Sequence, residues 1–272
     1  MMATRYEWIV DALAETWGSI EIVLADRPAD IYDAPTACPG WSVRDVLAHL
    51  VGFERMLQGE ALPEHEGAYP DYVRNAVGEI NEAVVADWRR RPLEELREAF
   101  TVTTAGSLAR LRGLSDEEWE RVGWSPEGER PYHRFMETRV LDSWIHLGDV
   151  RDALGLEGDD HGPGEAVVLG RLGAALPFVL GRRTAAPEGT RVAVELHGER
   201  AARYVVGVDG GRGVALAPEE SAANELVTST ALFWRRAAGR VDASHLLENP
   251  QTSVRGDAAL VSGLVEGLVV MI

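Results

Sequence analysis

Apolar residues recur at helical spacing along the first part of the chain. Beginning with Trp8, they form one face of an amphipathic helix over residues 8–24. A second apolar stripe covers residues 43–57. Ser42 precedes this stripe and Asp45 follows three residues later, a spacing that is typical of a capping box at a helix N-terminus.

Three more helices are predicted before residue 155, over 70–91, 93–113 and 131–154. Pro92 separates the first two, and a loop over 114–129 precedes the third. No strand pattern interrupts this part of the sequence. Residues 1–155 are therefore predicted to form an all-α helical bundle.

The composition changes after residue 155. Residues 156–164 are polar and rich in glycine, as is typical of a linker. The pattern beyond them predicts a mixture of elements: a helix over 165–182, strands over 191–196, 202–208 and 226–228, a helix around Phe233 and Trp234, and a helix over 258–269. Asp209-Gly210 is expected to form a hairpin turn. Residues 165–272 are therefore predicted to form a smaller α+β domain.

Length, charge and cysteine content narrow the class of protein. A chain of 272 residues exceeds the usual size of one hydrophobic core, in agreement with two domains. The formal net charge of −17 argues against nucleic-acid or membrane-surface partners. Arg171 and Glu266 interrupt the longest apolar stretches, the first residues lack a signal-peptide core, and one cysteine excludes an intrachain disulfide. We therefore expect a soluble cytoplasmic protein, whose oligomeric state the sequence does not predict.

The side chains best suited to bind a metal lie on two of the predicted helices. Asp142 and His146 are four residues apart, so both project from one helix face and can reach one divalent ion, although such pairs are often plain surface hydrogen bonds. His49 lies at the edge of the second helix's apolar stripe and should point into the bundle, either as a buried core residue or as a third ligand. Three protein ligands with one open position are typical of catalytic zinc. Asp149, three residues after His146, is placed to orient that imidazole.

The single cysteine is a weaker candidate for chemistry. Cys38 lies in a turn with Pro39 and Gly40, and Arg44 is the one basic residue near it in the sequence. A reactive thiolate needs a more positive environment than this. We therefore predict a structural role for Cys38 rather than a nucleophilic one.

Two stretches resemble a known family. Residues 38–50, Cys-Pro-Gly-Trp-Ser-Val-Arg-Asp-Val-Leu-Ala-His-Leu, closely resemble the signature of the mycothiol-dependent maleylpyruvate isomerase family, a branch of the DinB-like metal-binding bundles. The second half of that signature is matched by Trp144-Ile145-His146, Asp149-Val150-Arg151 and Ala153-Leu154-Gly155. The C-terminal half is similar to the family's second, sterol-carrier-like domain, through Gly239-Arg240 and Val254-Arg255-Gly256-Asp257.

The resemblance implies a ligand set and a cosubstrate. Members bind a divalent metal, usually zinc, through His, Glu and His, which fall here at His49, Asp142 and His146, so that an aspartate stands where the family has a glutamate. An essential arginine of the second domain is matched to Arg240, which would be both catalytic and cofactor-binding. The cosubstrate is mycothiol, a small thiol. Zinc, nickel and iron all accept such ligands, so the residues do not identify the metal.

Three functions are compatible with these residues. The first expectation is a thiol S-transferase that activates mycothiol at the metal and transfers it to an electrophilic small molecule. The first alternative is a mycothiol-dependent cis–trans isomerase of the maleylpyruvate type, which adds the thiol, lets a double bond rotate and expels the thiol again. The second alternative is a non-catalytic protein that binds a small molecule or a partner.

Overall fold

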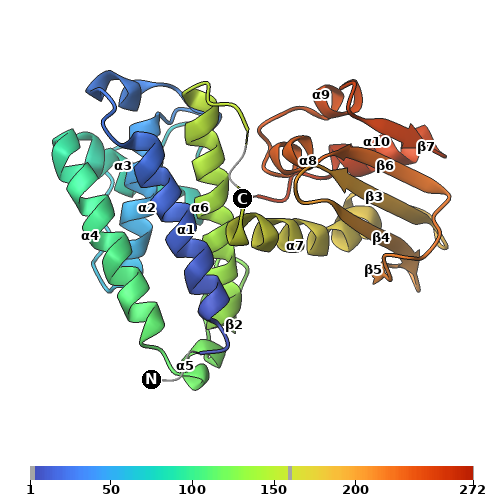
Figure 1. Ribbon diagram of the computed structural model, residues 1–272, viewed down its shortest axis with the longest axis horizontal. Helices are drawn as coiled ribbons and strands as arrows, with labels where there is room; N and C mark the ends of the chain where they lie inside the picture. The colour runs from blue at the N-terminus through green and yellow to red at the C-terminus, as the bar shows by residue number, and fades with distance from the viewer. Residues whose placement is uncertain (1–3, 159–160, 272) are drawn as a thin grey trace. The chain divides into compact units, whose positions relative to one another are not determined.

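The computed structural model describes residues 4–158 and 161–271 (Figure 1). These residues divide into two compact units, the first ending at Gly164 and the second beginning at Glu165. The first unit is helical and the second contains a sheet, as predicted. The division falls at the end of the predicted linker 156–164, of which residues 159–160 lie outside the described ranges.

The first unit is a bundle built on five longer helices. They are α1 (Glu7–Leu24), α2 (Val43–Leu57), α3 (Ala76–Arg89), α4 (Leu93–Arg112) and α6 (Tyr132–Ala153), with the short α5 (Asp116–Glu120) and a 3-10 turn η1 (Ala29–Asp33) between them. Helix α1 lies between α4 and α6 (Figure 1), while α2 packs against α3, α4 and α6. The predicted capping box is present at α2, where the Ser42 backbone N–H donates to the Asp45 carboxylate at 2.9 Å.

Close helix contacts form the core of this bundle. The indole N–H of Trp17 on α1 donates to the Ser143 hydroxyl of α6 at 3.1 Å, and both side chains are buried. Gly52 brings α2 against α3, because a Cβ at that position would lie 2.0 Å from a methyl carbon of Val84. This packing fixes the position of α2 between α3 and α6.

The structure corrects four sequence predictions in this unit. The loop predicted over 114–129 contains the short helix α5. The helix predicted over 70–91 begins only at Ala76, because the Asn75 side chain caps it by accepting from the Gly78 backbone N–H at 2.9 Å. Trp8, predicted on the apolar face, is 45% exposed. The prediction of no strand before residue 155 is wrong: β1 (Val122–Gly123) pairs antiparallel with β2 (Arg130–Pro131). Two-residue strands are too short to produce a period-two pattern.

The second unit combines a five-stranded sheet with helices. Its first element is helix α7 (Pro163–Phe178), which continues as a π turn η2 (Val179–Arg183). The remaining elements are β3 (Arg191–His197), β4 (Ala202–Asp209), β5 (Arg212–Leu216), β6 (Asn224–Ser229), α8 (Thr230–Ala237), α9 (Ala243–Leu247), β7 (Ser253–Arg255) and α10 (Ala258–Glu266). The strand order is β5-β4-β3-β6-β7, with β3 and β6 parallel and the other neighbours antiparallel.

Most of the predicted elements of this unit are present. The hairpin turn lies one residue later than expected, at Gly210 and Gly211, both with positive φ, because Asp209 still pairs with Arg212. The sequence pattern missed β5, α9 and β7, each at most five residues long. The last helix ends at Glu266 rather than at residue 269.

One described helical stretch, Pro163–Arg183, is long and apolar enough to cross a membrane by length and composition alone. The buried share of its apolar window is 56%, as in the core helix of a folded domain.

Candidate metal centre

The three predicted ligands meet between α2 and α6. His49 Nε2 is 3.2 Å from Asp142 Oδ2, and His146 Nε2 is 3.7 Å from Asp142 Oδ1. One possible ligand atom from each residue lies within 4.8 Å of the others. Both histidines are buried, whereas the Asp142 side chain is 19% exposed, so this trio of side chains is open to solvent on the aspartate side.

The spacing of the trio fits a small divalent ion. Zinc binds imidazole nitrogen and carboxylate oxygen at about 2.0–2.2 Å, so ligand atoms around a tetrahedral ion lie roughly 3.3–3.5 Å apart. Measured to one carboxylate oxygen, Asp142 Oδ1, the separations are 3.4 Å from His49 Nε2 and 3.7 Å from His146 Nε2, close to that value. The donor set therefore needs little rearrangement to hold such an ion.

Asp149 orients His146, as the sequence suggested. Its Oδ2 lies 2.9 Å from His146 Nδ1, which assigns the proton to that nitrogen and leaves Nε2 to face the trio. The buried Cys38 thiol donates to the same Asp149 oxygen at 3.2 Å. The Cys38 thiol therefore helps to hold the Asp149 carboxylate in place beside His146.

A second trio of possible ligand atoms shares His146. Cys38 Sγ, His146 Nδ1 and an Asp149 oxygen also lie within 4.8 Å of one another. The thiol and the ring N–H both donate to Asp149 there, so an ion at that position would have to displace two hydrogen bonds. In the trio of His49, Asp142 and His146, an ion would displace the hydrogen bond between His49 Nε2 and Asp142.

Sequence reasoning missed a buried ion-pair chain beside the trio. Arg139, 2% exposed, donates from Nη1 to Asp142 Oδ2 at 2.7 Å and from Nε to Glu54 Oε1 at 3.0 Å. Glu54 is itself buried and accepts from the Ser107 hydroxyl at 2.6 Å. The one available signal was the position of Arg139 three residues before Asp142, one turn along the same helix face.

Trp41, in the signature loop, forms one wall of the site. Its ring centroid lies 5.3 Å from that of His49 and 6.2 Å from that of His146. Its indole N–H donates to Glu82 of α3 at 3.1 Å, and the Tyr72 hydroxyl donates to the same carboxylate at 3.0 Å. The tryptophan is therefore fixed by α3, although it precedes α2 in sequence.

A single arginine of α3 completes the anchoring of this loop. Arg89 forms ion pairs with Asp45 at 2.9 Å and with Glu82 at 3.0 Å, and it donates to the Gly40 carbonyl at 3.0 Å. Gly40 has φ +75°, and a Cβ there would lie 2.4 Å from the Tyr72 ring. The positive φ and the closeness of the Tyr72 ring explain why residue 40, next to Trp41, is a glycine.

The pKa values of the two histidines in the trio are shifted in opposite directions. Burial lowers the pKa of His49, and the attraction of Asp142 does not reverse that effect. Burial would also lower the pKa of His146, but the charge of Asp142 and the hydrogen bond that His146 donates to Asp149 outweigh it and raise this pKa to about 10. Burial would raise the pKa of Asp142, yet the neighbouring positive charges, including Arg139, hold it far below its usual range.

Metal binding should therefore release a proton. His146 is charged below about pH 10 in the absence of an ion, and a metal accepts only the neutral imidazole. We expect about one proton per zinc ion between pH 7 and pH 9, with the affinity rising roughly tenfold per pH unit and levelling above pH 10. Calorimetric titration in two buffers of different ionisation enthalpy measures the proton count. An affinity that does not change from pH 7 to pH 9 would contradict this expectation.

Arg240 lies in the second unit, after the end of α8. Gly239 with φ +73° ends the helix, and the Arg240 backbone N–H donates to the Arg235 carbonyl at 2.7 Å. Its Nη1 donates to the Ala238 carbonyl at 2.9 Å. The match of Arg240 to an essential arginine of the family stays a prediction.

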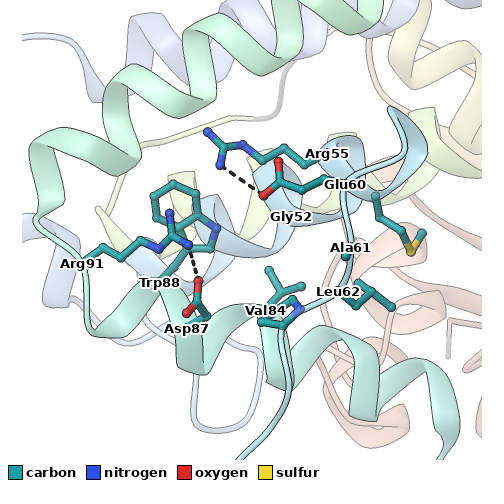
Figure 2. Close-up of a pocket in the computed structure, with 11 residues that line it drawn as sticks. Gly52, Arg55, Glu60, Ala61, Leu62, Val84, Asp87, Trp88 and Arg91 are labelled. Atoms are coloured by element: carbon teal, nitrogen blue, oxygen red, sulfur yellow. Dashed lines mark ion pairs between the residues drawn. The ribbon is translucent and has the colours of Figure 1, made fainter.

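Figure 2 shows a pocket elsewhere on the first unit, between α2, α3 and the loop after α2. Its charged side chains pair with each other, Arg55 with Glu60 at 3.6 Å and Arg91 with Asp87 at 2.7 Å. The pocket offers about 30 Å³ of free space and none of the trio lines it. It is too small for a thiol cofactor, and its charges are already neutralised.

The bundle and its inward trio place the protein among helical bundles that carry metal-type side chains in their interior. Residues 13–151, just over half of the chain, match the family model for the mycothiol maleylpyruvate isomerase N-terminal domain. The chain belongs to the mycothiol-dependent maleylpyruvate isomerase family, a family of enzymes, as the signature at residues 38–50 suggested.

Similar proteins extend this comparison. Two uncharacterized proteins of Mycobacterium tuberculosis, one from each of two strains, are 27% identical over 158 residues, which cover 57% of this chain and 59% of theirs. The chain therefore matches about three fifths of the length of these relatives. A crystal structure of the mycothiol-dependent maleylpyruvate isomerase aligns with a TM-score of 0.57 at 17% identity, over 93% of this chain and 95% of that one. A crystal structure of a histidine-to-alanine variant of that enzyme aligns with a TM-score of 0.53 at 18% identity, over 89% of this chain and 93% of that one. At these identities the likeness shows the fold.

Proposed function

We propose that this protein is a divalent-metal enzyme that uses mycothiol to isomerise a small electrophilic substrate of the maleylpyruvate type. The proposal rests on one observation: possible ligand atoms of His49, Asp142 and His146 lie close together in the bundle, at distances that suit a metal ion. Family membership favours isomerisation over the S-transfer that the sequence analysis placed first. A bound divalent ion would lower the pKa of a thiol, ordinarily about 8.5, and make it nucleophilic at neutral pH.

The chain's own residues prepare the site for such an ion. Two imidazoles and one carboxylate supply the donors, and Asp149 keeps the His146 Nδ1 proton in place so that Nε2 stays available. Trp41 stands against both histidines and shields that side from water. The partial exposure of Asp142 leaves an approach for the thiol and its partner.

The proposed reaction needs only addition and elimination of the thiol. A thiolate adds to one carbon of a carbon–carbon double bond, and the electron pair moves onto the adjacent conjugated carbonyl. The bond is then single and can rotate. Return of the electron pair expels the thiolate and restores the double bond in the trans form, so that no thiol is consumed.

Several finer assignments belong to the same proposal. Zinc is our choice of metal, although nickel and iron accept the same donors. We assign Arg240 to hold a carboxylate of the substrate or of the thiol, since a guanidinium binds carboxylates in two parallel hydrogen bonds. We further propose a DinB-like bundle, a sterol-carrier-like second domain and a cytoplasmic location, which the lack of a disulfide-forming cysteine pair suits.

Product analysis tests the reaction and its alternatives. Zinc-loaded protein is incubated with mycothiol and a cis substrate such as maleylpyruvate, and the mixture is followed by NMR and mass spectrometry. Isomerisation yields the trans product with all mycothiol recovered, whereas S-transfer accumulates a thiol conjugate. The His49→Ala variant is the control. A His49→Ala variant as active as the wild type would remove the metal centre from the mechanism. A protein that folds without metal and forms neither product would leave the non-catalytic binding protein as the better conclusion.

A further inference from the structure

An exposed tryptophan lies on the short hairpin before α6. Trp124 is 55% exposed and follows β1 directly. The turn after it is closed by two backbone hydrogen bonds between Ser125 and Gly128, at 3.1 and 3.0 Å. The Thr138 hydroxyl of α6 donates to Glu127 of this turn at 2.8 Å. The hairpin is therefore a fixed support that presents the indole to solvent against α6.

Aromatic contacts connect Trp124 with the metal-type trio. Its ring meets Phe135 edge-on at 5.9 Å between centroids. Phe135 in turn contacts Phe53 at 6.3 Å, and Phe53 contacts His49 at 6.0 Å. Both phenylalanines are buried, so Trp124 is the solvent-facing end of this row of rings.

The geometry of α6 sets the distance between Phe135, which contacts Trp124, and Asp142 of the trio. Phe135, Arg139, Asp142 and His146 follow one another at intervals of four, three and four residues and so lie on one face of α6. Seven residues separate Phe135 from Asp142, about 10 Å along the helix axis. Trp124 contacts Phe135, so its point of contact on α6 lies about two helical turns from Asp142.

We propose that Trp124 is the platform on which the sugar portion of the thiol cofactor rests. This inference builds on the proposed use of mycothiol, in which an N-acetylcysteine is joined to glucosamine and inositol, so that two rings lie at the far end from the sulphur. With the sulphur at the trio, those rings extend away from it along the molecule's length. An exposed indole offers a wide, rigid apolar face, against which the C–H face of a sugar ring packs.

Single exposed apolar side chains are common on protein surfaces, so we compare Trp124 with a second exposed tryptophan of the same chain. Trp8 is 45% exposed at the start of α1, and the aromatic contacts found among the described residues do not connect it with the trio. It has the same chemistry and a similar exposure. Trp8→Ala is therefore the matched control for Trp124→Ala.

The test compares a thiol with sugar and a thiol without it. Affinity for mycothiol and for N-acetylcysteine is measured by calorimetry on the full-length, zinc-loaded protein. Trp124→Ala should weaken mycothiol binding about tenfold, Trp124→Phe less than about threefold, and neither should change N-acetylcysteine binding. Trp8→Ala should change neither. Thermal unfolding checks that the variants remain folded, as expected for a half-exposed side chain.

The outcomes separate the platform from the proposed function. If the wild type binds mycothiol and Trp124→Ala binds it equally well, the platform is wrong and the function stands. Equal losses for both thiols would also overturn the platform, because the tryptophan would then act on the sulphur site. A wild type that binds neither thiol overturns the proposed function, and the platform with it.

Discussion

Alanine at His146 is expected to lower the zinc affinity of the protein roughly 100- to 1000-fold. Structural zinc in small peptides is bound by about 10–16 kcal/mol through four ligands, or about 3 kcal/mol for each. Loss of the buried His146 imidazole removes one donor of the three and leaves Asp142 without its second histidine. His49→Ala should have a similar effect. Metal content by plasma mass spectrometry on untagged protein, with chelator competition for the affinity, measures both.

The two histidine variants also distinguish the two possible ligand trios. His146 belongs to both trios, whereas His49 belongs only to the one with Asp142. Metal lost in His146→Ala but retained in His49→Ala would place the ion beside Cys38 instead. His245→Ala, an exposed histidine on α9 of the second unit, is the matched control and should retain the metal. Near-stoichiometric metal in both ligand variants would contradict the proposed centre.

Methionine at Arg139 is expected to destabilise the first unit by about 3–5 kcal/mol. Removal of one partner of a buried ion pair leaves the other charge without compensation in the interior. Here Glu54, which is 1% exposed, would lose its cation, and Asp142 would lose one of its hydrogen-bond donors. Urea unfolding followed by circular dichroism gives the change in the free energy of unfolding.

Two further variants show whether that loss comes from the buried charge. Arg90→Met removes an exposed arginine whose partner, the partly exposed Asp87, keeps its ion pair with Arg91, and should cost less than about 1 kcal/mol. Adding Glu54→Gln to Arg139→Met should recover part of the loss, because the uncompensated carboxylate is then neutral. A loss in Arg139→Met no larger than that in Arg90→Met would refute this account.

Periodicity and capping predicted most of the bundle because both are local signals. The stripe over residues 43–57 and the Ser42–Asp45 pair define α2 within one continuous segment of the chain, residues 42–57. Trp8 shows the limit of this reasoning, since the pattern predicted it on the apolar face of α1, whereas its side chain is 45% exposed. The strands β1, β2 and β7 are too short to repeat any pattern.

The site could be predicted only where residue type and helix spacing carry the information. Asp142, His146 and Asp149 follow one another at helical intervals, and the geometry agrees with their expected proximity. The ion pair of Arg139 with Glu54 joins residues 85 apart in sequence, and no local pattern shows it. The same holds for Cys38, whose hydrogen bond to Asp149 gives it a specific partner that the sequence did not predict.

The long sequence separations within the centre have a consequence for how the protein folds. His49 and Asp142 are 93 residues apart, and Cys38 and Asp149 are 111 apart. Closing such long loops is slow, so the centre forms only when α2 and α6 have already docked. A fragment that ends before α6 would lack two of the three donors. A metal ion can therefore stabilise the assembled bundle by mass action but cannot serve as its nucleus.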